Sequence, residues 1–279
     1  MPTQCSHHRN LPLAVARPAE GRECRLIDDL IQAMNRPAAV VTEIALGTHF
    51  IGVRADDNGK VCAGLASALG ARATTDERQL VEDLVGRPLR AAAEHLKRGR
   101  AFDISLGAAA LNAGIIAPQD QPELEASRIM AEKGREGETV LVGEFPFTDR
   151  LRRQVKTLHL FELRDVPGRA VPEHWDAILG RCRVFGLTGT TLLTRAMADY
   201  LQKAPQAYTI IIGPTTPLSP VLFTYGADVL AGCEVVAPNR YLPASARASR
   251  FGSLDSWECV LCLEKRGGSW LMRQANNTA

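Results

Sequence analysis

The sequence is poor in aromatic residues and has no excess of either charge, and both features limit what it can bind. Phe, Trp and Tyr make up 5% of the 279 residues, so a surface that stacks nucleic-acid bases is not expected. Lys and Arg number 33 and Asp and Glu 31, which leaves a formal net charge of +2. Because such a chain has no strong field to attract a polyanion, nucleic acid is not a predicted partner.

The sequence also lacks a long apolar run. The longest weakly apolar stretch, residues 104 to 117, is shorter than the roughly 20 residues that cross a bilayer. The apolar stretch near the start is too short for the core of an export signal. Seven cysteines, an odd number scattered along the chain, do not form the pattern of a disulfide framework. We therefore expect a cytoplasmic protein with no membrane partner.

Familiar catalytic and metal-binding motifs are missing as well. Neither G-x-S-x-G nor H-E-x-x-H occurs, so no simple hydrolase is indicated. Cys259 and Cys262 form a C-x-x-C pair, but on a strand their side chains would point to opposite faces of the sheet. A closed zinc site also needs four ligands, so a structural zinc is not predicted there.

The chain divides into segments with different patterns. After a flexible arm, residues 1 to 21, residues 22 to 120 combine a helix, a short meander of strands and further helices, which predicts an α+β domain. Residues 121 to 238 alternate strands and helices, which predicts an α/β domain with a mainly parallel sheet. The boundary is expected at residues 118 to 123, and residues 239 to 279 form a divergent tail.

Three predicted strands of the second domain end in loops that suit a ligand. Strands at residues 139 to 143, 182 to 188 and 208 to 213 continue into "GEFPF", "TGTT" and "GPTTPLSP". Parallel sheets bind ligands beyond the carboxyl ends of their strands, and glycine lets a ligand approach the backbone. The candidate ligand-binding residues of these loops are Gly143, Gly189, Thr190, Thr215 and Thr216.

Local capping is the alternative explanation for the same loops. Thr148, Thr190 and Ser219 could each be the N-cap of the helix that follows, with Pro220 at the first helical position. One helix with an apolar face over residues 193 to 201 is expected after the second loop.

Glu162 is a further candidate, as a ligand of a nucleotide ribose. It lies at the end of a predicted strand, 19 residues after Gly143, and dinucleotide-binding folds place a ribose-binding acid about 20 residues beyond their glycine turn. Against this, "GEFPF" is not G-x-G-x-x-G, and Pro146 removes a backbone donor where a pyrophosphate would need one. A salt bridge from Glu162 to Arg164 or to a neighbouring arginine is the alternative.

Seven segments together resemble a known family. "EIALGTHFIGV", "CAGLASAL", "SLGAAALNAG", "LVGEFPF", "LFELR", "LTGTTLLT" and "GPTTPLSPVLFTYGADVLAG" occur in the order seen in the two-domain proteins described as "Putative heavy-metal chelation". The resemblance covers about residues 26 to 238. It implies a first domain similar to the N-terminal domain of enolase, a Rossmann-like second domain and a ligand cleft between them.

The resemblance also implies the residues of that cleft. They are His49, expected on a strand and pointing opposite Phe50, together with Asn112, Glu144, Thr190, Thr215 and Thr216. The family usually has His where this chain has Glu144, and a carboxylate suits a hard or borderline cation better than a soft one. His49 and Glu144 are the candidate metal ligands, and a divalent metal ion is the cofactor to consider.

Two functions therefore remain open from the sequence. The first is binding of a metal, a metal chelate or a small anionic ligand in the cleft, without turnover. The second is an enzyme that uses a nucleotide cofactor, S-adenosylmethionine or NAD(P), on a small molecule. The partner is a small molecule or chelate in either case, and a homodimer is one option for the assembly.

Overall fold

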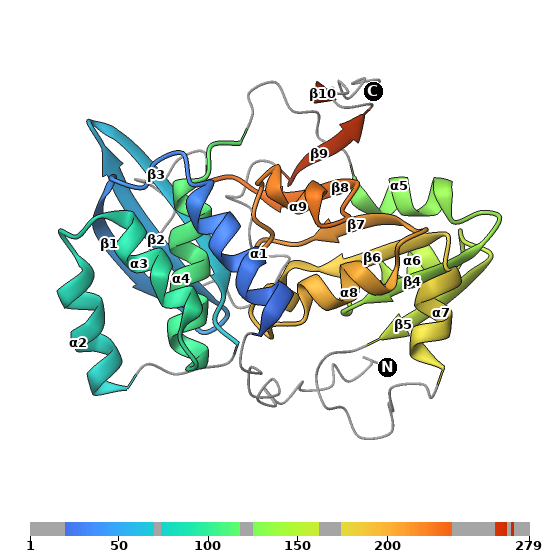
Figure 1. Ribbon diagram of the computed structural model, residues 1–279, viewed down its shortest axis with the longest axis horizontal. Helices are drawn as coiled ribbons and strands as arrows, with labels where there is room; N and C mark the ends of the chain where they lie inside the picture. Colours follow the sequence, from blue (N-terminus) through green and yellow to red (C-terminus); the bar gives the residue numbers. More distant parts are fainter. Residues whose placement is uncertain are drawn as a thin grey trace, which may run out of the picture.

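The computed structural model describes residues 20–69, 74–117, 125–161, 174–235, 260–266 and 269–270. In these ranges the chain forms an N-terminal unit with an antiparallel sheet and a C-terminal unit with a mainly parallel sheet, side by side (Figure 1). The predicted fold class, α+β followed by α/β, is confirmed. The expected boundary at residues 118 to 123 lies outside the described residues, and so do residues 1 to 19 of the arm.

The N-terminal unit is built on a three-stranded sheet in the order β1-β2-β3. Its strands are β1 (Val40–Leu46), β2 (Phe50–Asp57) and β3 (Lys60–Ser67). The turn between β2 and β3 places Asn58 and Gly59 at positive φ, 54° and 87°, which suits the Asn-Gly pair of a tight hairpin. The alternating apolar residues and this turn made the meander predictable from the sequence.

Helices cover one side of this sheet. They are α2 (Thr75–Leu84), α3 (Leu89–Ala93), the 3₁₀ helix η1 (Glu94–Lys97) and α4 (Ala101–Gly114). Helix α4 is almost completely buried and packs on β2 and β3. A Cβ added to Gly64 of β3 would lie 2.1 Å from the backbone nitrogen of Ala113. Only glycine permits this approach, which brings the C-terminal half of α4 against β3.

The C-terminal unit contains five parallel strands, which lie in the order β8-β7-β6-β4-β5. They are β4 (Glu138–Val142), β5 (Thr157–Phe161), β6 (Val184–Thr188), β7 (Tyr208–Ile212) and β8 (Val229–Cys233). Counted along the chain this order is 2-1-3-4-5, a common arrangement of doubly wound sheets. The strand order reverses between β4 and β6, the position where such sheets bind ligands.

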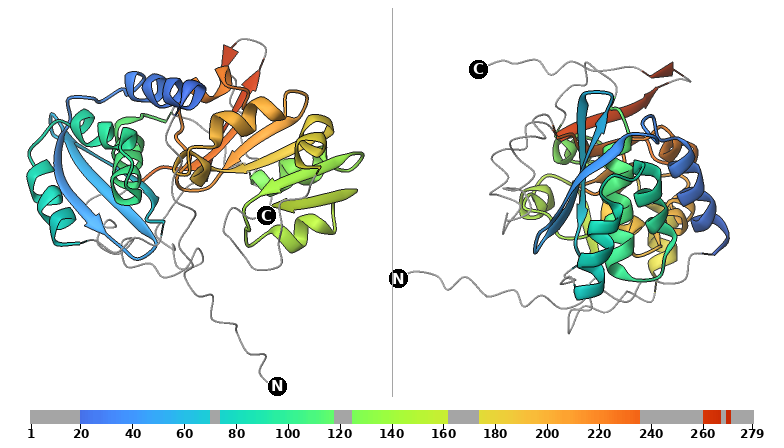
Figure 2. Two further views of the ribbon diagram at one scale, coloured as in Figure 1. Left: turned by 60° about the horizontal axis from the view of Figure 1, so that its bottom comes forward. Right: turned by 90° about the vertical axis from the view of Figure 1, so that its left-hand side faces the viewer.

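Two apolar clusters hold helices on the two faces of this sheet. Leu141 packs with Met130 and Leu151, under α5 (Ala126–Lys133) and α6 (Thr148–Arg152). Val140 belongs to the other cluster, together with Leu179 of α7 and buried residues of α8 and α9. These helices are α7 (Trp175–Arg181), α8 (Met197–Lys203) and α9 (Val221–Thr224), and Figure 2 shows the two layers.

Helix α1 (Gly21–Gln32) connects the two units. It precedes the N-terminal sheet in sequence but also packs against α8 and α9 (Figure 1). The hydroxyl of Tyr225 donates a hydrogen bond to Asp29 Oδ2 at 2.7 Å. The helix begins at Gly21, and its buried apolar residues are Leu26, Ile27, Leu30 and Ile31.

Three local predictions are corrected or extended. The expected single helix over residues 193 to 201 is interrupted, because Arg195 has φ 57°; a 3₁₀ turn, η2 (Gly189–Leu192), precedes α8 instead. His49 lies in the turn before β2 and not on a strand. Residues from the predicted tail form β9 (Val260–Arg266), antiparallel to β8, and β10 (Ser269–Trp270). Cys262 is in β9, and Cys259 lies outside the described residues.

Within the described ranges, no helix has the length and apolar character needed to cross a membrane.

Candidate functional site

The loop that follows β7 lies between the two units. Residues 214 to 219 are all buried. The hydroxyl of Thr215 accepts a hydrogen bond from the backbone N–H of Ser67 at 3.0 Å. The side-chain amide of Asn112 donates to the carbonyl oxygens of Leu65 at 2.8 Å and Thr215 at 3.3 Å. The loop of one unit is thereby fixed to β3 and α4 of the other.

Glycine contacts bring the loop after β6 against this loop and the loop after β4 against the end of β6. A Cβ on Gly189 would lie 2.5 Å from Thr216 Oγ1 and 2.6 Å from Thr216 N. Gly143 has φ 95°, and a Cβ there would lie 3.2 Å from Thr188 Cβ. The hydroxyl of Thr188 is hydrogen-bonded to that of Thr190 at 3.0 Å. The three predicted loops therefore do come together, and close packing accounts for Gly189.

A cavity of about 220 Å³ lies where the two units meet. We call it the central cavity. It is lined by β3 and α4 on one side and by the loop after β7 and the carboxyl end of β8 on the other. Its polar or sulfur-bearing lining residues are Arg36, Cys62, Asn112, Thr216, Cys233 and Glu234. Two residues predicted from the sequence, Asn112 and Thr216, are among them.

Three buried polar atoms of the cavity lining have no hydrogen-bond partner among the described residues. They are Arg36 Nε, Asn112 Oδ1 and Thr216 Oγ1. Arg36 Nε lies 3.6 Å from Asp57 Oδ2, an ion pair too long for a hydrogen bond. Since an unsatisfied buried polar group costs about 1–3 kcal/mol, a bound molecule or ordered water is expected at these atoms.

The orientation of Asn112 follows from its hydrogen bonds. Its side-chain nitrogen donates to two backbone carbonyls, and a flipped amide would place oxygen against oxygen. Oδ1 is therefore the atom left for a ligand, as an acceptor. The Arg36 N–H is a hydrogen-bond donor, and the Thr216 hydroxyl can donate or accept. These groups together suit an anion that also carries a hydrogen-bond donor.

The same lining does not fit a bare metal ion. No group of three or more His, Cys, Asp or Glu that could hold a metal occurs in the described part of the chain. Burial raises the pKa of the Cys62 thiol more than the neighbouring Arg36 lowers it, so the thiol stays protonated near neutral pH. Metals bind the thiolate, and the guanidinium of Arg36 adds a positive charge beside any cation.

The remaining predicted residues lie outside the cavity lining. Glu144 is exposed, and Thr190 is half-buried with its hydroxyl on Thr188. The carbonyl of His49 accepts from the N–H of Ala68 at 2.8 Å, next to the Ser67–Thr215 contact. The metal-ligand roles of His49 and Glu144 stay predictions. Glu162 lies outside the described residues.

None of the three predicted N-caps occupies that position: Phe147 is the N-cap of α6, Thr188 that of η2 and Pro220 that of α9. Thr148 and Ser219 do form hydrogen bonds within their own loops. The hydroxyl of Thr148 accepts from the N–H of Phe145 at 3.0 Å, across the turn before α6. The hydroxyl of Ser219 accepts from Val221 N at 3.4 Å, at the start of α9. Thr190 is not an N-cap, because Thr188 occupies that position before η2.

A second polar contact between the units involves Glu23 and Arg195. Glu23 Oε2 accepts from the N–H of Ala198 at 2.8 Å, and Arg195 Nη2 donates to the carbonyls of Leu96 at 2.8 Å and Arg98 at 2.5 Å. Both charged side chains are buried. Burial raises the pKa of Glu23 to about 7 and lowers that of Arg195. Together with α1, this contact fixes the two units around the central cavity.

Sequence reasoning missed Arg36, Glu23 and Arg195. Arg36 follows α1 and precedes a proline, a setting with no recognisable motif. Glu23 and Arg195 form hydrogen bonds with residues that are distant in the sequence, and Arg36 lines a cavity together with such residues. Arg195 also has a positive φ, but the residue types around it do not reveal this conformation.

Comparison with known proteins gives matches to one family and its structures. Two family models, both described as "Putative heavy-metal chelation", match residues 27–115 and 125–256. The second match continues past residue 238, where the resemblance was expected to end. A search of curated proteins found no match.

Two crystal structures of proteins with unknown function from this family share the fold. One, from Desulfitobacterium hafniense DCB-2, has a TM-score of 0.72 and 22% identity, over 87% of this chain and 98% of that chain. The other, from Pyrococcus horikoshii, has a TM-score of 0.61 and 16% identity, over 77% of this chain and 88% of that chain. At these identities the likeness shows the fold alone.

Proposed function

The chain belongs to the family described as "Putative heavy-metal chelation", and we propose that it binds a small anionic ligand, alone or as the chelator of a metal ion, in the central cavity. One observation carries the proposal. Three buried polar atoms without a hydrogen-bond partner among the described residues, Arg36 Nε, Asn112 Oδ1 and Thr216 Oγ1, belong to residues that line the same cavity from three separate segments.

The donor and acceptor pattern of these atoms selects a class of ligand. The Arg36 guanidinium favours a carboxylate or phosphate, and Asn112 Oδ1 needs a hydroxyl or N–H donor from the ligand. Small hydroxy- or amino-carboxylates carry both groups. They also chelate metals through these same groups, so a metal ion would enter as cargo that the ligand holds.

The loop after β7 supports binding by being rigid before the ligand arrives. Pro214 and Pro217 restrict φ, and the hydrogen bond from Ser67 N–H to Thr215 fixes the loop to β3. A wall that is already ordered lowers the entropic cost of binding. We assign Thr215 to holding the loop and Thr216 to contacting the ligand.

Calorimetric titration with citrate, with Zn²⁺ and with their complex tests the proposal. We expect the Arg36→Gln variant to bind citrate or zinc citrate at least about tenfold more weakly, because it loses a charge-assisted hydrogen bond. Arg54→Gln is the matched control: Arg54 is 24% exposed and pairs with Glu43, and Arg36 is 22% exposed and pairs with Asp57. Equal affinity in the wild type and Arg36→Gln would exclude the central cavity as the site.

A nucleotide-dependent enzyme is the second candidate. Its support is the strand order, which reverses between β4 and β6, with Gly143 at positive φ directly after β4. Cofactor-dependent conversion of a small molecule, assayed with NAD(P)H and with S-adenosylmethionine, separates the two functions, since the first requires no turnover. Under either function we place the protein in the cytoplasm, with a small molecule as its partner.

A further inference from the structure

Two adjoining hollows lie along α5, on the sheet face opposite α8. One, of about 510 Å³, has a mostly apolar lining, and the other, of about 520 Å³, is lined mainly by polar and charged residues of α5 and α6. They share Glu125, Ser127 and Arg150. We call the combined hollow the α5 groove. Each half has the size of a typical small-molecule site, about 300–1,000 Å³.

The apolar end of the α5 groove lies at the carboxyl ends of three strands. Phe145 and Phe147 follow β4, and their rings are stacked with centroids 5.1 Å apart and planes at 14°. Ile212 ends β7, Pro214 follows it, and Ala231 belongs to β8. Flat aromatic and apolar surfaces of this kind favour a planar ring over a flexible chain.

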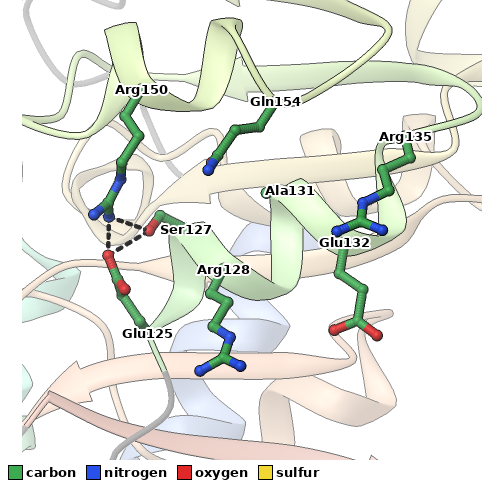
Figure 3. A pocket seen from close by; sticks show the side chains of 8 residues that line it. All are labelled: Glu125, Ser127, Arg128, Ala131, Glu132, Arg135, Arg150 and Gln154. Carbon is green, nitrogen blue, oxygen red and sulfur yellow. Dashed lines mark hydrogen bonds and ion pairs between the residues drawn. The ribbon is translucent and has the colours of Figure 1, made fainter.

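The polar end carries three arginines. Figure 3 shows Arg150 of α6 and Gln154, which follows α6, extending toward α5, with Arg128 on the other side of α5 and Arg135 beyond its end. Arg150 is bound to Glu125 and donates to Ser127 Oγ at 2.8 Å. Arg128 and Arg135 have no acidic partner among the residues that the structure places.

We propose that the α5 groove binds a nucleoside polyphosphate. The base would lie in the apolar end near Phe147, and the phosphates would extend to the polar end, toward Arg128 and Arg135. Bases stack on aromatic side chains regardless of their identity, and guanidinium groups bind phosphate oxygens in a planar, bidentate manner. Two glutamates also line the polar end: Arg150 neutralises Glu125, and Glu132 offsets only one of the two charges of Arg128 and Arg135.

The α5 groove is a separate site from the central cavity, although it uses the same loop after β4 as the second candidate function. Arg36, Asn112 and Thr216 do not line the α5 groove, and neither an anion in the central cavity nor enzymatic turnover is needed. A failure to bind nucleotides would leave the central-cavity proposal unchanged.

Titration of the full chain with ADP, adenosine and inorganic pyrophosphate tests the inference. We expect ADP to bind at least tenfold more tightly than either fragment, because only ADP contacts both ends. The double variant Arg128→Gln with Arg135→Gln should weaken ADP and pyrophosphate at least tenfold and leave adenosine unchanged. Phe147→Ala should weaken ADP and adenosine and leave pyrophosphate unchanged.

A matched control removes the same charge elsewhere. Arg152 and Arg153 are exposed next to the groove but do not line it, so Arg152→Gln with Arg153→Gln should bind ADP as the wild type does. Melting curves on each variant verify the fold. The inference is overturned if ADP does not bind at millimolar concentration, if it binds no better than pyrophosphate, or if the control variant loses as much affinity as the groove variant.

Discussion

The hydroxyl of Thr215 accepts a hydrogen bond at 3.0 Å from the backbone N–H of Ser67, a residue 148 positions earlier in the chain. This bond joins the loop after β7 to the end of β3 and so links the two units. The next residue, Thr216, is equally buried, but its hydroxyl has no partner among the described residues. Two adjacent threonines thus have different roles, one structural and one open to a ligand.

The Thr215→Val and Thr216→Val variants should therefore differ. Thr215→Val leaves the N–H of Ser67 unsatisfied and should lower the free energy of unfolding by about 1–3 kcal/mol. Thr216→Val removes an unpartnered hydroxyl and should leave this free energy unchanged or slightly higher. Urea denaturation of the two single variants measures the difference.

Ligand affinity should show the opposite pattern. Thr216→Val should weaken binding of zinc citrate by about 1 kcal/mol, the contribution of one hydrogen bond, and Thr215→Val should bind nearly as the wild type does. Equal losses of stability in both variants would mean that Thr216 is also structural.

Gly189→Ala should destabilise the protein by about 1–3 kcal/mol through overpacking. The added Cβ would lie 2.5 Å from Thr216 Oγ1 and 2.6 Å from Thr216 N, and the second atom is backbone that cannot rotate away. Thermal unfolding measures the effect. Gly180→Ala is the control, since a Cβ there meets nothing within 4 Å and alanine favours its helix, α7, by up to about 1 kcal/mol. A neutral Gly189→Ala would contradict the close contact of the two loops.

Stability should depend on pH through Glu23. Its pKa is raised from 4.5 to about 7, mainly by burial, so between these values the folded state keeps a proton that the unfolded state has lost. The contribution is fully present below pH 4.5 and is lost as the pH rises to about 7. For a shift of this size the loss is on the order of 3 kcal/mol.

The Glu23→Gln variant isolates this contribution, because glutamine does not titrate. The difference in unfolding free energy between wild type and variant should change with pH over this window and be constant outside it. Glu82→Gln, at an exposed position of α2, should keep the wild-type pH dependence. A Glu23→Gln variant that follows the wild-type curve throughout would show that Glu23 ionises normally.

Much of the fold could be predicted because its signals are local. The Asn58–Gly59 turn, the apolar repeat of α1 and the alternation of strands and helices after residue 125 are all visible in the sequence. The local predictions that were wrong depend on the backbone conformation of a few residues. The positive φ of Arg195 interrupts a helix that the apolar pattern alone would continue, and His49 falls in a turn one residue before β2 begins.

The candidate site could be predicted only in part, for a physical reason. Loops at the carboxyl ends of parallel strands must share one edge of the sheet, so the meeting of the loops with Gly143, Gly189 and Thr216 followed from the predicted topology. The hydrogen-bond partner of each polar group could not be predicted from this topology. Thr215 is satisfied by a backbone N–H, and Arg36 reaches the central cavity from a segment with no motif.

A crystal structure of the protein soaked with citrate tests the central claim most directly. The account predicts density for citrate in the central cavity, with a carboxylate oxygen within hydrogen-bond distance of Arg36 Nε and a hydroxyl directed at Asn112 Oδ1. Ordered water satisfies buried polar atoms in many proteins. Water molecules bonded to Arg36, Asn112 and Thr216 at saturating citrate, with citrate elsewhere or absent, would contradict it.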